Sequence, residues 1–249
     1  MKKQFLIFAT IATVVIVSCS KKNIEAPGTN QPEEIATAMA SANKGKGNTL
    51  DAGLLCRFEF DGNLNDKTGQ VSPGVSTVGR VLYTADRKGE PNKALRFNGA
   101  YGVTISEVPL DTNRSISVWV KKDVVVLGIV TPIVEGMNSF TLAQDKPMYM
   151  AGYYNDAPGT SQYVLSPAMD NNWHHLAATR DNNTLRFYVD GNFVGSSPTP
   201  AGTVFLPVSD WLLGWGYNAG YVYWKGNIDE LRLYDRVLTA AEINKLSNF

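Results

Sequence analysis

From residue 54 onward, apolar and polar side chains alternate with a period of two, and turn residues interrupt the pattern roughly every eight to twelve residues. In the stretch LLCRFEF, Cys56, Phe58 and Phe60 share one face, and charged residues occupy the other. A period of two is the period of a β-strand. Since no strand–helix–strand order is present, the pattern predicts antiparallel sheets and an all-β fold.

The predicted strands are bounded by Gly, Asn, Asp or Pro. They cover residues 54–60, 94–98, 101–106, 115–122, 129–135, 140–144, 148–153, 163–166, 174–180, 185–189, 193–197, 211–215 and 227–234. The short turns at residues 181–183 and 190–192 predict a meander of three strands. The chain ends differently, because Thr239 and Glu242 have the spacing of a capping box and predict a short terminal helix. Ile243 and Leu246 of this helix are expected to face the sandwich.

The N-terminus has the features of an export signal. Lys2 and Lys3 precede an apolar run over residues 5–17 that is too short to span a membrane comfortably, and the run stops at Ser18-Cys19. This junction resembles the lipobox of bacterial lipoproteins, although Val or Ile stands where the lipobox usually has Leu. The resemblance implies removal of residues 1–18, a lipid on Cys19, and an exported protein held by that anchor at the outer membrane or cell surface. The alternative is an ordinary secretory signal.

Residues 19–51 are rich in Lys, Asn, Pro, Glu, Ala, Ser and Gly and almost free of large apolar side chains. Such a segment buries too little surface to offset its ordering entropy, so it is expected to be a flexible tether. The folded domain is then residues 52–249. Once Cys19 is lipidated, Cys56 has no partner for a disulfide, and its place in the alternation predicts a small buried hydrophobe.

The chain contains 23 Lys and Arg and 23 Asp and Glu, a formal net charge of zero. A nucleic-acid-binding protein usually presents a strongly basic face to the phosphate backbone. The composition therefore argues against a nucleic acid as partner.

Five sequence blocks carry a family resemblance. In chain order they are FEFDGNLNDKTGQ, ALRFNGAYGVTI, SISVWVK, NWHHLAATRDNNTLRFYVDGNFVG and GNIDELRLYDRVLTAAEI. They resemble consecutive blocks of the laminin G-like, concanavalin A-like lectin/glucanase jelly roll, over residues 52–249. The resemblance implies two antiparallel sheets packed face to face, closed by pairing of the first and last strands. It leaves the function open, because this fold carries lectins, adhesion modules, glycosidases and lyases.

The patterns of catalytic residues are missing. The glucanases of this fold place their carboxylates on one strand as E-x-D-x-x-E or E-x-D-x-E, and the lyases use Q-I-H; neither string occurs here. Asp229 and Glu230 are adjacent, as are His174 and His175, so the members of each pair are expected to face opposite sides of a sheet. We therefore expect no enzymatic activity.

The resemblance also implies a calcium ion, since many relatives hold one where the first and last strands meet. Calcium requires several oxygen ligands. The candidates are Asp229 in the last strand block, and Glu59 and Asp61 on the outward face of the first strand. The alternative is that Asp229 caps a turn and Glu59 is solvated.

Aromatic residues gather in two places and are the candidates for stacking on a sugar ring. The candidate ligand-binding residues are Trp215, Tyr217, Asn218, Tyr221 and Tyr223 in the first cluster, and Tyr153 and Tyr154 in the second. Because Trp211, Leu213 and Trp215 share one face of a strand, the alternative for the tryptophans is burial in the core.

Together these patterns predict a non-catalytic surface lipoprotein whose lectin-like domain binds a glycan or polysaccharide. The alternative is an adhesion or assembly module that binds a cell-surface protein.

Overall fold

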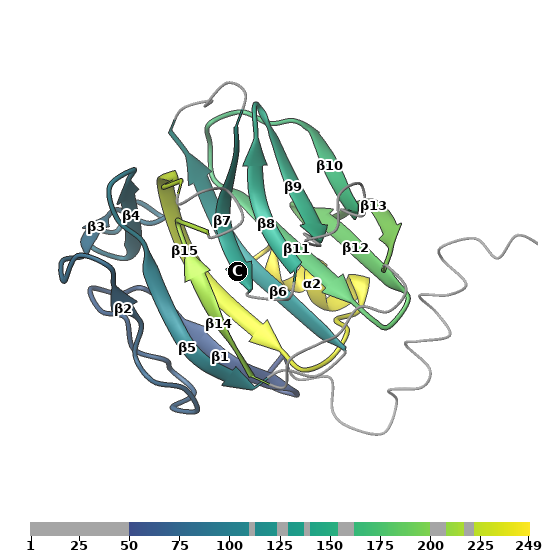
Figure 1. Cartoon of the computed structure of the whole chain (residues 1–249), viewed down its shortest axis with the longest axis horizontal. Coiled ribbons are helices and arrows are strands. Elements are labelled where there is room, and N and C mark those ends of the chain that lie inside the picture. Colours follow the sequence, from purple (N-terminus) through teal and green to yellow (C-terminus); the bar gives the residue numbers. More distant parts are fainter. Residues whose placement is uncertain are drawn as a thin grey trace, which may run out of the picture.

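The computed structural model describes residues 50–109, 113–123, 129–136, 140–153, 162–199, 208–216 and 222–249. In this part of the chain, two antiparallel sheets pack face to face, and a single short helix lies outside one of them (Figure 1). We call them sheet A and sheet B. No helix in these ranges has both the length and the apolar character needed to cross a membrane.

Sheet A has the strand order β13-β12-β11-β6-β15-β4-β3, and β1 also pairs with β15. Its strands are β1 (Leu54–Phe58), β3 (Leu82–Thr84), β4 (Ala94–Asn98), β6 (Arg114–Lys122), β11 (His174–Arg180), β12 (Thr184–Val189), β13 (Asn192–Pro198) and β15 (Lys225–Tyr234). The predicted meander is confirmed as β11, β12 and β13. Asp190 and Gly191 both have positive φ in the second turn, as the tight turn requires.

Sheet B has the strand order β10-β9-β8-β7-β14-β5-β2. Its strands are β2 (Val75–Ser76), β5 (Val103–Pro109), β7 (Val130–Gly136), β8 (Phe140–Asp145), β9 (Met148–Tyr153), β10 (Gln162–Ala168) and β14 (Val208–Leu213). The sequence did not predict β2 and β3. Each is an edge strand of two or three residues, too short for a periodic pattern.

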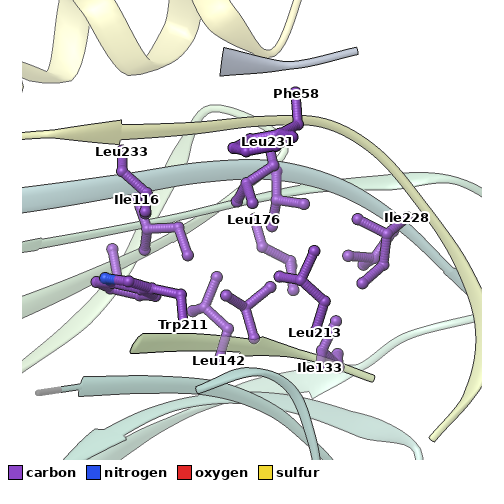
Figure 2. Close-up of a cluster of buried hydrophobic side chains, with 14 of the residues drawn as sticks. Phe58, Ile116, Ile133, Leu142, Leu176, Trp211, Leu213, Ile228, Leu231 and Leu233 are labelled. Atoms are coloured by element: carbon purple, nitrogen blue, oxygen red, sulfur yellow. The ribbon is translucent and has the colours of Figure 1, made fainter. Parts of the chain in front are cut away.

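The core fills the space between the two sheets. Figure 2 shows Leu231 and Leu233 of β15 pointing from sheet A toward Trp211 and Leu213 of sheet B, and all four are buried. Cys56 of β1 belongs to the same core, where burial raises the pKa of its thiol. The prediction of a small buried hydrophobe is therefore confirmed, as is the closure of the fold by pairing of β1 with β15.

A second apolar cluster joins helix α2 (Ala240–Leu246) to the outer side of sheet A. Its buried members are Ala177, Tyr188, Tyr234, Leu238, Ile243 and Leu246, with Leu50 and Leu54 packed against them. The predicted capping box is present in both halves, because Thr239 Oγ1 accepts from Glu242 N and Glu242 Oε2 accepts from Thr239 N. The helix therefore covers part of the outer side of sheet A.

Strand β15 contains a β-bulge that corrects the expectation for Asp229 and Glu230. The register shifts between Asp229 and Arg232, and Glu230 has a φ of 50°. The bulge breaks simple alternation. Both carboxylates consequently enter one network of arginines, Asp229 through Arg87 and Glu230 through Arg232.

Candidate functional site

A row of cross-strand partners crosses the outer face of sheet B, the face turned away from the core. From edge to edge it runs through Val75, Thr104, Leu212, Glu135, Thr141, Gly152 and Tyr163. The row is exposed at both ends and covered in the middle. Glu135 and Thr141 are each only 1% exposed, whereas Tyr163 at the β10 edge is 57% exposed.

Tyr163 is exposed because of its neighbours in the sheet. Val164 points inward and packs against the core, so Tyr163 must point outward. Its cross-strand partner is Gly152, which has no side chain to cover the ring; a Cβ at Gly152 would lie 3.0 Å from Tyr163 Cβ. The phenol ring therefore stands exposed on the outer face.

Glu135 occupies the centre of the row on β7. The backbone at Gly216 passes directly over it, since a Cβ at Gly216 would lie 2.2 Å from Glu135 Oε2 and 2.6 Å from Pro132 Cγ. The segment 214–216, which follows β14, therefore lies over this face at Gly216. Glu135 is a buried carboxylate beneath that segment, close to the start of the predicted aromatic cluster.

Two of the predicted ligand residues, Trp215 and Tyr223, stack on each other. Their ring centroids are 6.3 Å apart with an interplanar angle of 18°, and their backbones form an isolated β-bridge. Trp215 is largely buried because it lies against Gly102, where a Cβ would come within 2.0 Å of the indole. Tyr223 is half-buried. Trp215 thus leaves the strand face that Trp211 and Leu213 share in the core, since β14 ends before Gly214.

The other predicted positions lie outside what the structure describes. Tyr154, Tyr217, Asn218 and Tyr221, and also Cys19, fall outside the described residues. Tyr153 is described only as a backbone position in β9.

The three predicted calcium ligands, Asp229, Glu59 and Asp61, contact separate sets of cations. The ion pairs are Asp229 with Arg87 (2.6 Å), Glu59 with Arg57 (2.6 Å) and Lys67 (3.0 Å), and Asp61 with Lys93 (2.7 Å). Among the described ranges, no group of three or more His, Cys, Asp or Glu side chains is arranged to hold a metal ion. As they stand, these side chains do not fit a calcium shell, because such a shell would require the ion pairs to open.

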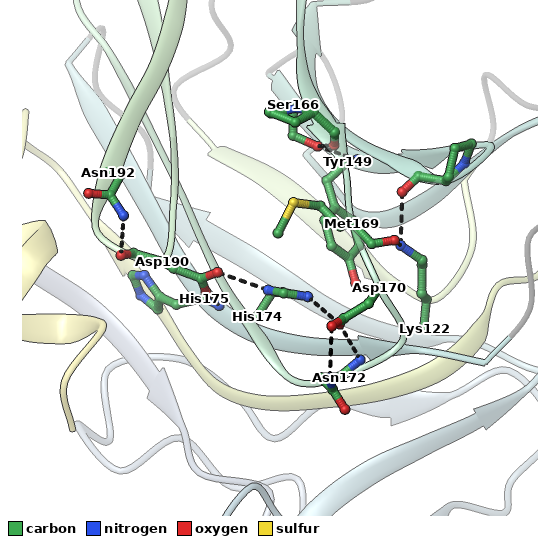
Figure 3. A network of polar contacts seen from close by, with 12 residues as sticks. Lys122, Tyr149, Ser166, Met169, Asp170, Asn172, His174, His175, Asp190 and Asn192 are labelled. Atoms are coloured by element: carbon green, nitrogen blue, oxygen red, sulfur yellow. Dashed lines mark hydrogen bonds and ion pairs between the residues drawn. The ribbon is translucent and has the colours of Figure 1, made fainter.

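His174 lies between two carboxylates at the start of β11 (Figure 3). Its Nδ1 is 2.8 Å from Asp190 Oδ2, and its Nε2 is 2.9 Å from Asp170 Oδ1. The hydrogen bond to Asp190, joined by that to Asp170, raises the pKa of His174 against the opposing effect of burial. Both ring nitrogens are engaged, so this imidazole links the β10–β11 connection to the β12–β13 turn.

His175 faces the opposite side of sheet A, as predicted. Its Nε2 lies 2.8 Å from Ser117 Oγ, and its ring packs against Trp119. Burial lowers the pKa of His175 to about 3, so the ring is neutral at physiological pH. The two histidines therefore do not form a shared metal or catalytic site.

The two antiparallel sheets and the closing β1–β15 pair define a jelly-roll sandwich. A family model described as the concanavalin A-like lectin/glucanases superfamily matches residues 97–244, more than half of the chain. The chain belongs to this family. No curated protein sequence matches it.

Solved structures share the fold. Domain 4 of AbnA, a GH43 extracellular arabinanase from Geobacillus stearothermophilus solved in complex with arabinotriose, is 23% identical with a TM-score of 0.63, covering 78% of this chain and 98% of that one. The binding domain of botulinum neurotoxin DC, solved in complex with SialylT and with rat synaptotagmin II, is 13% identical with a TM-score of 0.61. Those matches cover 80% of this chain, which spans about half of the toxin domain (52%).

Tyr163 was not among the residues that the sequence singled out. The alternation in β10 could have indicated it, because Gln162 and Val164 lie on one face of the strand and Tyr163 between them lies on the other. What the pattern did not reveal was the pairing with Gly152, which leaves the ring uncovered.

Proposed function

We propose that this protein is a non-catalytic, lipid-anchored surface protein that binds a glycan on the outer face of sheet B. The observation that carries the proposal is the exposed Tyr163 ring, held beside Gly152 on a sheet face. A pyranose or furanose offers an apolar C–H face to such a ring, and a tyrosine orders few rotatable bonds when it binds.

The polar groups near this ring suit a sugar. Asp145, which is partly exposed, ends β8 two strands from Tyr163, whereas Thr141 and Glu135 in the row itself are buried. Hydroxyls and carboxylates accept hydrogen bonds from sugar hydroxyls. The half-buried Tyr223, stacked on Trp215, offers a second aromatic edge beyond the end of β14.

The non-catalytic part of the proposal rests on the carboxylates. Glycoside hydrolysis requires two carboxyl groups across the scissile bond. In the central row of the described outer face, Glu135 is the one carboxylate, and it is buried. The similar folds support binding, since one was solved with arabinotriose and another with SialylT. A protein partner is the second candidate, because the latter domain was also solved with rat synaptotagmin II.

The test compares Tyr163→Ala with Phe193→Ala in the full chain. Phe193 is a similarly exposed aromatic residue (49%) on β13 of sheet A, so it controls for loss of surface ring area. Retardation in affinity gels with a panel of polysaccharides should weaken for Tyr163→Ala by about 1 kcal/mol or more, roughly fivefold. Phe193→Ala should bind like wild type, and both variants should unfold within about 0.5 kcal/mol of it.

Equal retardation of wild type and Tyr163→Ala would show that the glycan does not bind at Tyr163. If wild type is retarded by no polysaccharide, the proposal of a glycan is wrong, and the protein-partner candidate takes its place.

A further inference from the structure

The charges of the domain divide unequally between the two sheets. The strands of sheet B, residues 75–76, 103–109, 130–136, 140–145, 148–153, 162–168 and 208–213, contain no Lys or Arg. The same strands contain four carboxylates: Glu107, Glu135, Asp145 and Asp210. The formal net charge of these strands is therefore −4, in a chain whose total is zero, and Lys146 lies in the turn between β8 and β9.

Arg80 is exposed beside β2, at the edge of sheet B far from Tyr163, whereas several cations of the neighbouring strands are buried. Arg114 and Arg180 lie opposite each other on β6 and β11 and are 2% and 0% exposed, so they present no charge at the surface. Lys122 is buried as well, where its ammonium donates to Pro147 O and Met169 O. Lys225 lies over Gly99, beside the β4–β5 connection.

The carboxylates are placed along the same face as the aromatic ring. Glu135 lies in the row that ends at Tyr163, and Asp145 is at the end of β8, two strands from Tyr163. Glu107 is exposed at the far end of β5, where its backbone N–H donates to Asp210 Oδ1 at 3.2 Å. A ligand beside Tyr163 would therefore meet the partly exposed Asp145, whereas Glu135 is buried.

From this distribution we propose that the saccharide bound by sheet B is neutral, and that sialylated, sulfated and uronate glycans are excluded. The inference rests on the proposed glycan-binding function and specifies its ligand class. A sugar carboxylate or sulfate is recognised best by Arg or Lys, through charge-assisted and often bidentate hydrogen bonds. Like charges brought together disfavour binding. Uncharged hydroxyls instead find acceptors in these carboxylates.

A glycan array that contains neutral and acidic structures tests this with the full chain at low and physiological salt. The strongest signals should come from neutral glycans and should change little with salt, because no ion pair is screened. Strongest binding to sialylated, sulfated or uronate glycans would overturn the inference and leave the proposed function standing. The absence of any signal would instead contradict the proposed function, so the two failures are distinguishable.

A second experiment uses the neutral polysaccharide that binds best and a derivative of it oxidised to carry carboxylates. We expect the derivative to bind at least tenfold more weakly at low salt. Asp145→Asn should reduce the difference in binding between the parent polysaccharide and the derivative by roughly two- to threefold, the size of one surface charge interaction. Glu90→Gln is the matched control, because Glu90 is an exposed acid in the turn between β3 and β4 of sheet A. Equal binding of parent and derivative would contradict the inference.

Discussion

His174 and His175 are adjacent in the sequence but have opposite electrostatic environments. Hydrogen bonds to Asp190 and Asp170 raise the pKa of His174 above its ordinary 6.5. The stabilisation that protonated His174 contributes is therefore fully present below about pH 6.5. It is lost as the pH rises through the pKa of His174 in the folded protein. We expect His174→Gln to destabilise the protein more at pH 5.5 than at pH 8.5, as measured by urea unfolding.

His175→Gln is the control with the opposite sign. The pKa of His175 is lowered to about 3 in the fold, so below about pH 6.5 only the unfolded chain takes up a proton there, and wild type loses stability. The destabilisation by His175→Gln should therefore shrink as the pH falls from 8.5 to 5.5. Parallel pH dependences for the two variants would show that their environments are not as described.

At the scale of elements, Gly214 decides where β14 ends. Its φ is 70°, its N–H donates to Ile133 O at 2.8 Å, and a Cβ would lie 2.3 Å from the Phe97 ring. Gly214→Ala should therefore lower the free energy of unfolding through two effects. The left-handed backbone conformation costs about 1–2 kcal/mol for alanine, and overpacking against Phe97 costs about 1–3 kcal/mol. Chemical denaturation of Gly214→Ala and Gly69→Ala measures the two contributions.

Gly69 isolates the backbone contribution, because it has the same φ of 70° with nothing within 4 Å of an added Cβ. Gly69→Ala should show the strain alone. If the two variants lose the same stability, then contact with Phe97 does not restrict position 214.

At the scale of the whole molecule, the described chain begins on the side of sheet A. Leu50 packs against the cluster beneath α2, on the opposite side of the sandwich from the outer face of sheet B. A lipid on Cys19 would be joined to the domain at this side through the predicted tether. We expect labelled palmitate to be incorporated into wild type and lost in Cys19→Ala.

Cys56→Ala is the control for this experiment. Cys56 is the one other cysteine of the chain and is buried in the core, so its replacement should leave the label in place. Retention of the label by Cys19→Ala would exclude Cys19 as the lipidated residue.

The elements of the fold were largely predictable. The boundaries of β4, β9 and β11 agree with the alternation, and the capping box of Thr239 and Glu242 marks the start of α2. These features depend on interactions between residues that are close in the sequence. The bulge at Glu230 and the end of β14 at Gly214 were not predicted, because each depends on a contact with a distant strand.

The sequence by itself determined the fold class and the inward set of side chains, because the period of the pattern is a local property. Only the tertiary structure decided which outward-facing side chains are exposed. Glu135 and Tyr163 both point away from the core, yet Glu135 lies beneath Gly216 and Tyr163 stands uncovered beside Gly152. Alternation specifies the face of a sheet that a side chain occupies, and what covers that face is set by segments far away in the chain.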